Sequence, residues 1–507
     1  MKRIKISFLF LLTLGGFSCT KLDESFRSEL EQSNSSNITA AQLLINAYDG
    51  LNGPFQTGDL WHISEHTTDE LIGPTRGGDW DDNGQWRALH AHTWNADQGQ
   101  IGGAYNGLLG TQFSASNVLQ FSPSPQQAAE ARFIRALSMY AVLDGFDQVP
   151  FREDLTNYKI LPKTLKGKEA ADFVIAELNA ILPALPATGP SYVASKNAAR
   201  ALLMKVYLNR GVYTNRASPT FDAADMNMVI SLADQITGFS LNDNFFDNFA
   251  PDNDVKSKEN IFTLFNIAGG RGGNVRGAAF QTSHYNMNPG GWNGFTTLSD
   301  FYDKFEAVDQ RIGKYYTYPG SLPNKGKRVN VGFLIGQQYN LTTDSLLFAR
   351  NPATKPLAFT REVKIKEADA ATLEYTGIRV IKYPFDYATT GDQKNNDWAI
   401  FRYADVLLMK SEAQFRTGNT AAPLITINDL RAKRGATPLL AVNLTNMLDE
   451  RGRELYWEGW RRQDLIRFGK YLQPWQEKPT DNPRNLLFPI PSNQLSVNPN
   501  LAQNPGY

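Results

Sequence analysis

The stretch FRYADVLLMKSEAQFRTGNTAAPLITINDLRAKR, residues 401–434, decides the fold class. Apolar side chains recur at helical spacing over 401–416 and again over 421–434, and Gly418 lies between the two runs. A glycine just past a periodic segment is typical of a helix end. Two helices with their turn match the length of a tetratricopeptide unit, about 34 residues. The apolar positions that fit such a packed pair are Leu407, Leu408, Ala413, Ile425 and Leu430.

Helical periodicity recurs elsewhere along the chain. The other segments are 39–51, 126–143, 195–208 and 448–468. Gly211 predicts the end of the third segment, and Gly459 predicts a break inside the fourth. Strand-like runs are few, and the clearest is IRVIKY at 378–383. The chain is therefore predicted to be mainly α, with several helix-turn-helix units rather than a uniform repeat array.

Composition bounds the function classes. Of the 507 residues, 42% are hydrophobic and 20% are charged, which is typical of a globular protein. The 51 basic and 51 acidic side chains give a net charge of +0, so no bulk attraction to nucleic acid is expected. A single cysteine excludes an intrachain disulfide and a cysteine-based zinc site.

The first residues indicate an export signal. Basic side chains within residues 2–5 precede the apolar run ISFLFLLTL at 6–14. This run is too short to span a bilayer, which takes about 20 residues, and it is typical of a secretory signal peptide. Small residues then lead to Cys19, as in the lipobox of a bacterial lipoprotein. We therefore expect a signal peptide at 1–18 and lipidation of Cys19. Ordinary cleavage that leaves a free thiol is the alternative.

The polar stretch after the cysteine, within residues 19–36, predicts a tether between the lipid and a folded body. No other segment is apolar enough to cross a bilayer. Three later segments, 53–100, 238–295 and 312–398, are rich in Gly, Pro, Asn and Asp. Loops of this length inside a compact domain are usually functional, so we expect ligand contacts there.

Seven short motifs follow one another in a fixed order. They are ARFIRA (131–136), FRYADVLL (401–408), NDLRAKRG (428–435), ERGRELYWEG (450–459), RRQDLIRFG (461–469), FPIP (488–491) and QNPGY (503–507). Together with the lipoprotein-like start, this set resembles the SusD/RagB family of outer-membrane nutrient-binding lipoproteins. The resemblance extends over nearly the whole mature chain.

This resemblance implies a role rather than a reaction. Family members are lipid-anchored in the outer membrane, face the cell exterior, and act as a lid on a SusC-like TonB-dependent barrel. They capture oligosaccharides, or in some branches peptides, and pass them inward. The implied fold is a SusD-like α-helical body with tetratricopeptide-like pairs and a long-loop ligand-binding face. Regions 37–237 and 238–507 are expected to intertwine in one globular body. Nucleic acid is not an expected partner.

Two loops carry the binding hypothesis. RGGDWDDNGQW at 76–86 and YNMNPGGWN at 285–293 combine aromatic rings with amides or carboxylates on a glycine-rich frame. An indole face packs against the apolar face of a sugar, and polar side chains bind its hydroxyls. The candidate ligand-binding residues are Asp69, Arg76, Trp80, Trp86, Tyr285, Trp292 and Arg379. The alternative is that the indoles anchor the loops to the body.

Metal chemistry is a weaker expectation. No cofactor is predicted, although the acidic residues at 79–82 could hold calcium weakly. HISEH at 62–66 matches the H-x-x-E-H zinc pattern, with Glu65 as a base, so a zinc-dependent hydrolase is carried as an alternative function. Gly53, Pro54 and Gly58 precede it and argue against a stable helix there. We therefore expect that the protein is not an enzyme.

Glu450, Glu454 and Glu458 repeat at a spacing of four, which is repulsive on a helix unless cations neutralise it. Arg453 lies three residues from Glu450, and Arg461 and Arg462 lie three and four residues from Glu458, so these arginines can neutralise the acids. We interpret the run as a helix-packing ion network rather than a binding site.

Overall fold

The computed structural model describes residues 38–507, except 153–154, 158, 370–371 and 480. Thr39–Tyr507 form one compact unit, and the expected boundary between 37–237 and 238–507 falls inside it. The predicted signal peptide, the tether and Cys19 lie outside the described residues. None of the described helices is long and apolar enough to cross a membrane.

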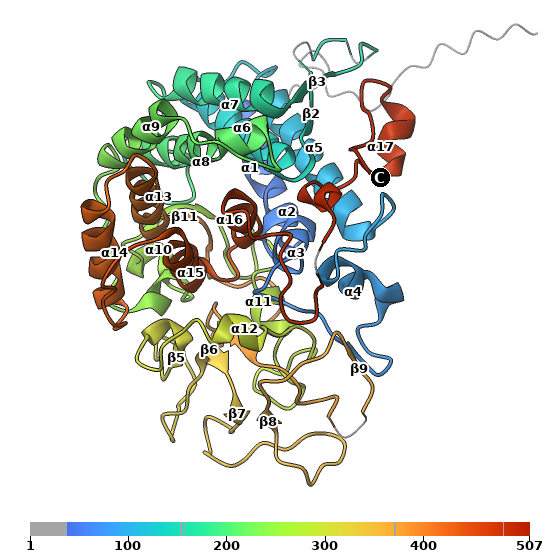
Figure 1. Ribbon diagram of the computed structural model, residues 1–507, viewed down its shortest axis with the longest axis vertical. Helices are drawn as coiled ribbons and strands as arrows, with labels where there is room; N and C mark the ends of the chain where they lie inside the picture. The colour runs from blue at the N-terminus through green and yellow to red at the C-terminus, as the bar shows by residue number, and fades with distance from the viewer. Residues whose placement is uncertain (1–37, 153–154, 158, 370–371, 480) are drawn as a thin grey trace, which may run out of the picture. The chain divides into compact units, whose positions relative to one another are not determined.

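Long helices build the upper part of this unit in Figure 1, and each packs against the next along the chain from α5 to α9. Their bounds are α1 (Ala40–Gly50), α5 (Gly99–Val118), α6 (Pro125–Phe146), α7 (Gly167–Ile181), α8 (Lys196–Thr214) and α9 (Ala223–Asp234). Capping boxes at Thr39 and Ser124 start α1 and α6, because each hydroxyl and the glutamine three residues later satisfy backbone N–H groups reciprocally. About 42% of the chain is helical, which confirms the mainly α prediction.

The predicted end of α8 at Gly211 is wrong, because the helix continues to Thr214. A β-carbon at Gly211 would lie 1.7 Å from the carbonyl oxygen of Thr220. The glycine therefore allows a close backbone approach instead of ending the helix.

The stretch 401–434 forms the predicted helix pair, α13 (Tyr403–Arg416) and α14 (Ala421–Lys433), and Gly418 adopts φ 91° in the turn between them. The pair begins two residues later than predicted. Phe401 and Arg402 belong to β11 (Trp398–Arg402), which pairs antiparallel with β4 (Asn260–Leu264). A short buried apolar run does not distinguish a strand from a helix by periodicity.

The segment 448–468 also forms a pair, α15 (Leu444–Leu455) and α16 (Arg461–Arg467), with Gly459 at φ 83° between them. The other α-helices of the described residues are short, and four 3-10 helices of three or four residues are also present. The short α-helices are α2 (Asn52–Phe55), α3 (Asp59–Glu65), α4 (Gln85–His90), α10 (Asn253–Lys256), α11 (Gly277–Phe280), α12 (Ser299–Tyr302) and α17 (Ser492–Val497).

The remaining strands are short and form small separate sheets, most of them at the lower end in Figure 1. β10 (Arg379–Ile381), β6 (Val331–Leu334) and β5 (Gly313–Lys314) form a three-stranded antiparallel sheet, in which β10 lies inside the predicted strand 378–383. The two-stranded pairs are β2 (Gln148–Phe151) with β3 (Lys163–Lys166), β1 (Thr75–Arg76) with β9 (Lys366–Glu367), and β7 (Gly336–Gln337) with β8 (Ala358–Phe359).

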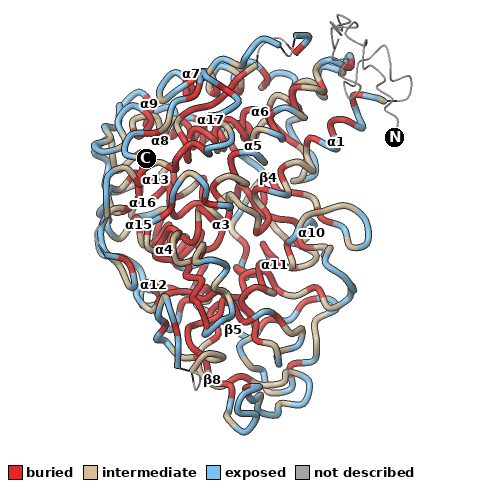
Figure 2. Tube along the Cα trace, turned by 90° about the vertical axis from the view of Figure 1, so that its right-hand side faces the viewer, coloured by how far each residue is buried: buried red, intermediate tan, exposed pale blue. Residues whose placement is uncertain are grey.

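Buried residues lie along the helices and through the middle of the unit, while the tip around β8 is mostly exposed or half-buried (Figure 2). The interior includes the predicted ion network. Glu454 accepts hydrogen bonds from Arg311, Arg402 and Arg434, all fully buried. These cations come from distant segments. Of the three arginines predicted to neutralise the glutamates, only Arg453 pairs with one of them, Glu450, at 2.6 Å.

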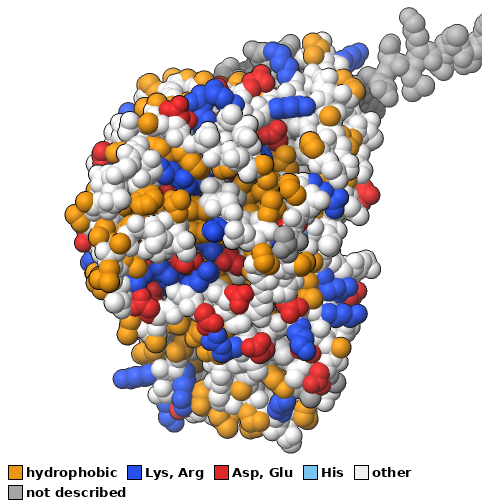
Figure 3. Space-filling model, in the orientation of Figure 1, with side chains coloured by type: hydrophobic (Ala, Val, Ile, Leu, Met, Phe, Trp, Pro, Cys, Tyr) orange, Lys and Arg blue, Asp and Glu red, His pale blue; other side chains and the backbone are white. Residues whose placement is uncertain are grey.

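The other two cations predicted to neutralise the run have different partners. Arg461 binds Asp69 through two nitrogens, and Arg462 donates to the carbonyl of Leu486. The helix-packing interpretation is therefore confirmed, but two of the three predicted pairings are wrong, because Glu454 and Glu458 face cations from other elements. Basic and acidic side chains are interspersed over the face shown in Figure 3, in keeping with the net charge of +0.

Candidate functional site

Two loops that are distant in sequence meet at one surface. We name them the Trp80 loop, residues 76–86, and the Trp292 loop, residues 284–293. The indole Nε1 of Trp80 donates to the carbonyl oxygen of Trp292 across 3.0 Å. The hydroxyl of Tyr285 donates to Asp79 Oδ2 across 3.2 Å. The structure therefore brings together the two segments that the sequence singled out.

Three aromatic residues of these loops, Trp80, Tyr285 and Trp292, form what we call the aromatic platform. Trp292 is 49% exposed, and the other two are half-buried. The ring centroids of Trp80 and Trp292 lie 6.3 Å apart at an angle of 51°. The guanidinium of Arg350 lies 3.3 Å from the centroid of Tyr285, so it covers one face of that ring. Arg350 is a site neighbour that sequence reasoning missed, because no motif marks it.

The platform rests on a continuous stack of buried rings. Trp80 contacts Phe295 at 4.7 Å and Trp86 at 6.2 Å between centroids. Trp86 in turn stacks on His66 at 4.8 Å, and His66 lies 5.5 Å from His62. The histidines of the H-x-x-E-H pattern therefore support the tryptophans from below.

Backbone geometry holds Trp80 in an uncommon conformation. Its φ is 59°, in the left-handed region that bulky residues rarely adopt. Asn293, beside Trp292, adopts φ 55°. A β-carbon on Gly294 would lie 2.3 Å from the Trp80 ring, so only glycine lets the indole lie this close. Such strain persists where the surroundings determine it, and it is frequent in ligand sites.

Arg76 and Arg379, predicted as ligand contacts, are buried and hold the loops in place. Arg76 donates to the carbonyl oxygens of Gly294 and Thr376 at 3.1 and 2.9 Å. Arg379 donates to the carbonyl oxygen of Thr376 and to Asn293 Oδ1, both at 2.7 Å. Neither guanidinium has a carboxylate partner among the described residues. Both arginines therefore hold the Trp292 loop in position from the interior. Because they are buried, they are not part of the proposed contact surface.

Burial affects these two cations directly. It lowers the pKa of Arg76 to about 10, and it lowers the pKa of Arg379 well below its usual range, with Arg76 as a second cause. Carbonyl oxygens take the place of acids as their partners. A buried charge is costly unless it is hydrogen-bonded. Moving the loops away from the turn at 373–377 would break these hydrogen bonds, so the two arginines hold the loops to that turn.

Asp69 and Trp86 also face the interior rather than solvent. Asp69 is 7% exposed and accepts two 2.7 Å hydrogen bonds from Arg461. Burial would raise the pKa of Asp69, but Arg461 outweighs it and holds that pKa below its ordinary value. Trp86 is 6% exposed, and its Nε1 donates to Asp82 Oδ2 at 2.6 Å. For Trp86 the loop-anchor alternative fits.

The acids predicted to hold calcium have protein partners. Asp79 accepts from Tyr285, Asp81 pairs with Arg87, and Asp82 accepts from Trp86. Over residues 38–507 with their gaps, no group of three or more His, Cys, Asp or Glu side chains is placed to hold a metal ion. The calcium site stays a prediction.

The H-x-x-E-H segment is helical in α3, contrary to the expectation from the preceding Gly53, Pro54 and Gly58. Burial lowers the pKa of His62 to about 3, and it holds the pKa of His66 well below its usual range. Glu65 Oε1 accepts from the backbone N–H of Gly459 at 2.5 Å, so it is turned toward the segment between α15 and α16. These residues pack as core groups.

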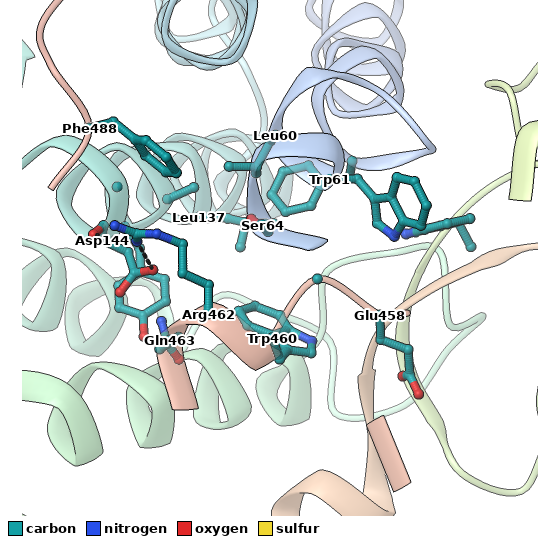
Figure 4. A pocket seen from close by; sticks show the side chains of 16 residues that line it. Leu60, Trp61, Ser64, Leu137, Asp144, Glu458, Trp460, Arg462, Gln463 and Phe488 are labelled. Atoms are coloured by element: carbon teal, nitrogen blue, oxygen red, sulfur yellow. Dashed lines mark hydrogen bonds and ion pairs between the residues drawn. The ribbon is translucent and has the colours of Figure 1, made fainter. Parts of the chain in front are cut away.

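A small cavity lies in the helical body, between α3, α6 and the start of α16 (Figure 4). Trp61, Trp460 and Phe488 line it, and Arg462 pairs with Asp144 at its edge. Its volume is about 40 Å³. That space suits a few water molecules, which need at least about 10–15 Å³ each, and it is too small for a sugar ring.

Comparison with known proteins places the chain in a family. The model of the SusD family matches residues 233–483. Starch-binding protein SusD of Bacteroides thetaiotaomicron is 27% identical over 422 residues, which cover 75% of this chain and 73% of that protein.

The chain belongs to the SusD family. A SusD superfamily protein from Parabacteroides distasonis has the same fold, with a TM-score of 0.70 and 18% identity over 94% of this chain and 100% of that one. Surface glycan-binding protein A from Bacteroides thetaiotaomicron, solved in complex with laminarihexaose, has a TM-score of 0.68 and 16% identity. That match covers 92% of this chain and 98% of that one. The family resemblance and the SusD-like helical body expected from the motifs are confirmed.

Proposed function

We propose that this protein is a cell-surface receptor that binds oligosaccharide or polysaccharide on the aromatic platform. The arrangement of Trp80, Tyr285 and Trp292 on two adjoining loops carries the proposal. Burying part of an exposed ring against a sugar contributes about 25 cal/mol per Å² of apolar surface. Supporting this cargo, relatives are named for binding starch and for a complex with laminarihexaose.

The binding test uses the variant Trp80→Ala/Trp292→Ala with a panel of purified polysaccharides that includes starch and laminarin. We expect its affinity to fall by at least about ten-fold, or 1.4 kcal/mol, because two ring faces are lost. Tyr315→Ala is the matched control, since Tyr315 is 36% exposed and lies outside the platform. Unchanged affinity of the double variant would contradict the proposal. Binding of peptides with no binding of polysaccharide would favour the peptide alternative.

The proposal includes a lipid anchor on Cys19 and delivery to a SusC-like TonB-dependent outer-membrane transporter. Both rest on the family and on the lipobox-like sequence. We expect the wild-type chain in the outer-membrane fraction and Cys19→Ser in the soluble fraction. Co-purification of this protein with a TonB-dependent barrel from native membranes would support the proposed partnership. A wild-type chain that separates from such a barrel under gentle extraction contradicts it.

No chemical step belongs to this role. The proposed protein releases its glycan unaltered, so chromatography of the sugar after long incubation is expected to show the original chain length. Shortened products that disappear with a chelator would instead favour the zinc-hydrolase alternative. His62→Ala would then abolish the activity.

A further inference from the structure

A second cavity lies beside the platform, lined by the middle of the Trp292 loop, by β6 and β7, and by the segment 385–387. Its volume is about 250 Å³. Small-molecule sites start at roughly 300 Å³, so the cavity fits a ligand group of the size of one sugar ring. We propose that it is a subsite for one neutral sugar unit of the bound glycan. This inference rests on the proposed function and adds a second contact to it.

Several polar groups in this cavity are free to bind. Within the described residues, the side-chain amide of Asn288, the Nδ2 of Asn340 and the hydroxyl of Tyr339 make no hydrogen bond to protein. An amide both donates and accepts, and so does a phenol. A sugar hydroxyl has the same double requirement, so each of these groups can pair with one.

The charge of the lining indicates a neutral sugar. Arg328 is the one charged residue among the described lining residues. Its Nε donates to Asp344 Oδ1 at 2.8 Å, and its guanidinium lies 3.6 Å from the centroid of Tyr339. An acidic or sulfated sugar would therefore find no unpaired cation in the cavity. A neutral hexose needs none.

Apolar side chains complete the cavity and match the C–H face of a sugar. They include Phe333, Leu347, Phe385 and Tyr387. The cavity also adjoins the platform, because Tyr285 and Asn286 are consecutive and their Cα atoms are about 3.8 Å apart. A glycan chain that lies on the platform is therefore within reach of the cavity.

The test fills the cavity without touching the platform. Val329 lines the cavity and is 47% exposed, so Val329→Trp adds an indole there with little demand on the core. Val255→Trp is the matched control, at an 83% exposed position outside the cavity. Titration calorimetry uses maltoheptaose and laminarihexaose as neutral probes and an oligogalacturonate as the acidic probe. We expect Val329→Trp to weaken binding of the neutral probe about ten-fold, and Val255→Trp to leave it unchanged.

Asn288→Ala provides a second variant, because Asn288 is exposed and its side chain holds no other element. We expect a smaller loss of affinity for the same probe. Wild-type affinity in both Val329→Trp and Asn288→Ala, with binding lost in Trp80→Ala/Trp292→Ala, overturns the subsite and leaves the proposed function standing. A wild-type chain that binds none of the sugars overturns both. Tighter, Val329-dependent binding of the oligogalacturonate overturns the neutral specificity.

Discussion

Trp80 is held by the backbone of Trp292 rather than by its side chain, because the indole Nε1 donates to the carbonyl oxygen 3.0 Å away. The two residues lie 212 positions apart in sequence. Replacing the Trp292 side chain therefore leaves the acceptor in place. The two rings can be removed one at a time, and the platform can be dissected ring by ring.

Gly294→Ala tests whether the position of Trp80 matters for binding. The added β-carbon would lie 2.3 Å from the Trp80 ring and 2.8 Å from the carbonyl oxygen of Gln281. We expect the indole to move and glycan affinity to fall, with a loss of stability of about 1–3 kcal/mol from overpacking. Affinity electrophoresis and urea unfolding measure the two effects. Gly110→Ala in α5, where a β-carbon meets nothing within 4 Å, is the control, and equal binding by the two variants contradicts the expectation.

Arg379→Lys tests the positioning role of the buried arginines. Lysine keeps the charge but loses the planar fork that reaches Asn293 and the turn at 373–377 together. A hydrogen bond to a charged group contributes about 1.5–3 kcal/mol, so we expect the Trp292 loop to loosen. Faster amide hydrogen exchange in peptides spanning 285–294 is the readout. Exchange rates equal to those of Arg361→Lys, an exposed control, would show that Arg379 does not hold the loop.

Asp69→Ala tests a structural ion pair. It leaves Arg461 without its bidentate partner in a buried setting. Breaking a buried pair costs about 3–5 kcal/mol, whereas the exposed pair removed by Lys168→Ala contributes about 0.3–0.5 kcal/mol. Urea unfolding measures both variants. We expect Asp69→Ala to bind glycan normally while folded, and a selective loss of binding without loss of stability would return Asp69 to the ligand surface.

Glu65→Gln tests a pH-dependent contribution to stability. Burial raises the pKa of Glu65 from 4.5 to about 7. The folded state therefore binds this proton more tightly than the unfolded state. Its stabilisation is fully present below about pH 4.5 and is lost as the pH rises to about 7. We expect the free energy of unfolding of the wild type, relative to Glu65→Gln, to decline across this window.

Buried histidines act with the opposite sign. The pKa of His62 is lowered by burial, so its contribution is lost as the pH falls below 6.5. It is present in both proteins and cancels in their difference. Glu169→Gln, which removes an exposed carboxylate in the first turn of α7, is the control for the substitution itself. The same pH dependence for Glu65→Gln as for this control would show that the raised pKa of Glu65 has no effect on stability.

The helices were predictable because their signals are local. The pair α13 and α14 follows from apolar spacing and Gly418, and the loops at 76–86 and 285–293 follow from composition. Gly211 misled because a glycine needed for a close backbone contact looks the same as one that ends a helix.

The roles of individual polar residues were not predictable. Asp69 finds its partner 392 positions away, and no pattern in the sequence links it to Arg461. Trp80 and Trp86 share one loop, yet α4 begins at Gln85 and turns Trp86 onto His66, while Trp80 stays at the surface. Which side of a loop faces solvent depends on tertiary packing.

Because the indoles differ in burial, intrinsic tryptophan fluorescence can report ligand binding to this protein. Of its nine tryptophans, Trp61, Trp86, Trp94, Trp398, Trp457 and Trp460 are buried. Within the part of the chain that the structure describes, Trp292 is the one exposed tryptophan. A sugar that covers it removes water from that ring, so the intrinsic fluorescence is expected to shift to shorter wavelength as ligand is added. Cargo can then be screened without any label.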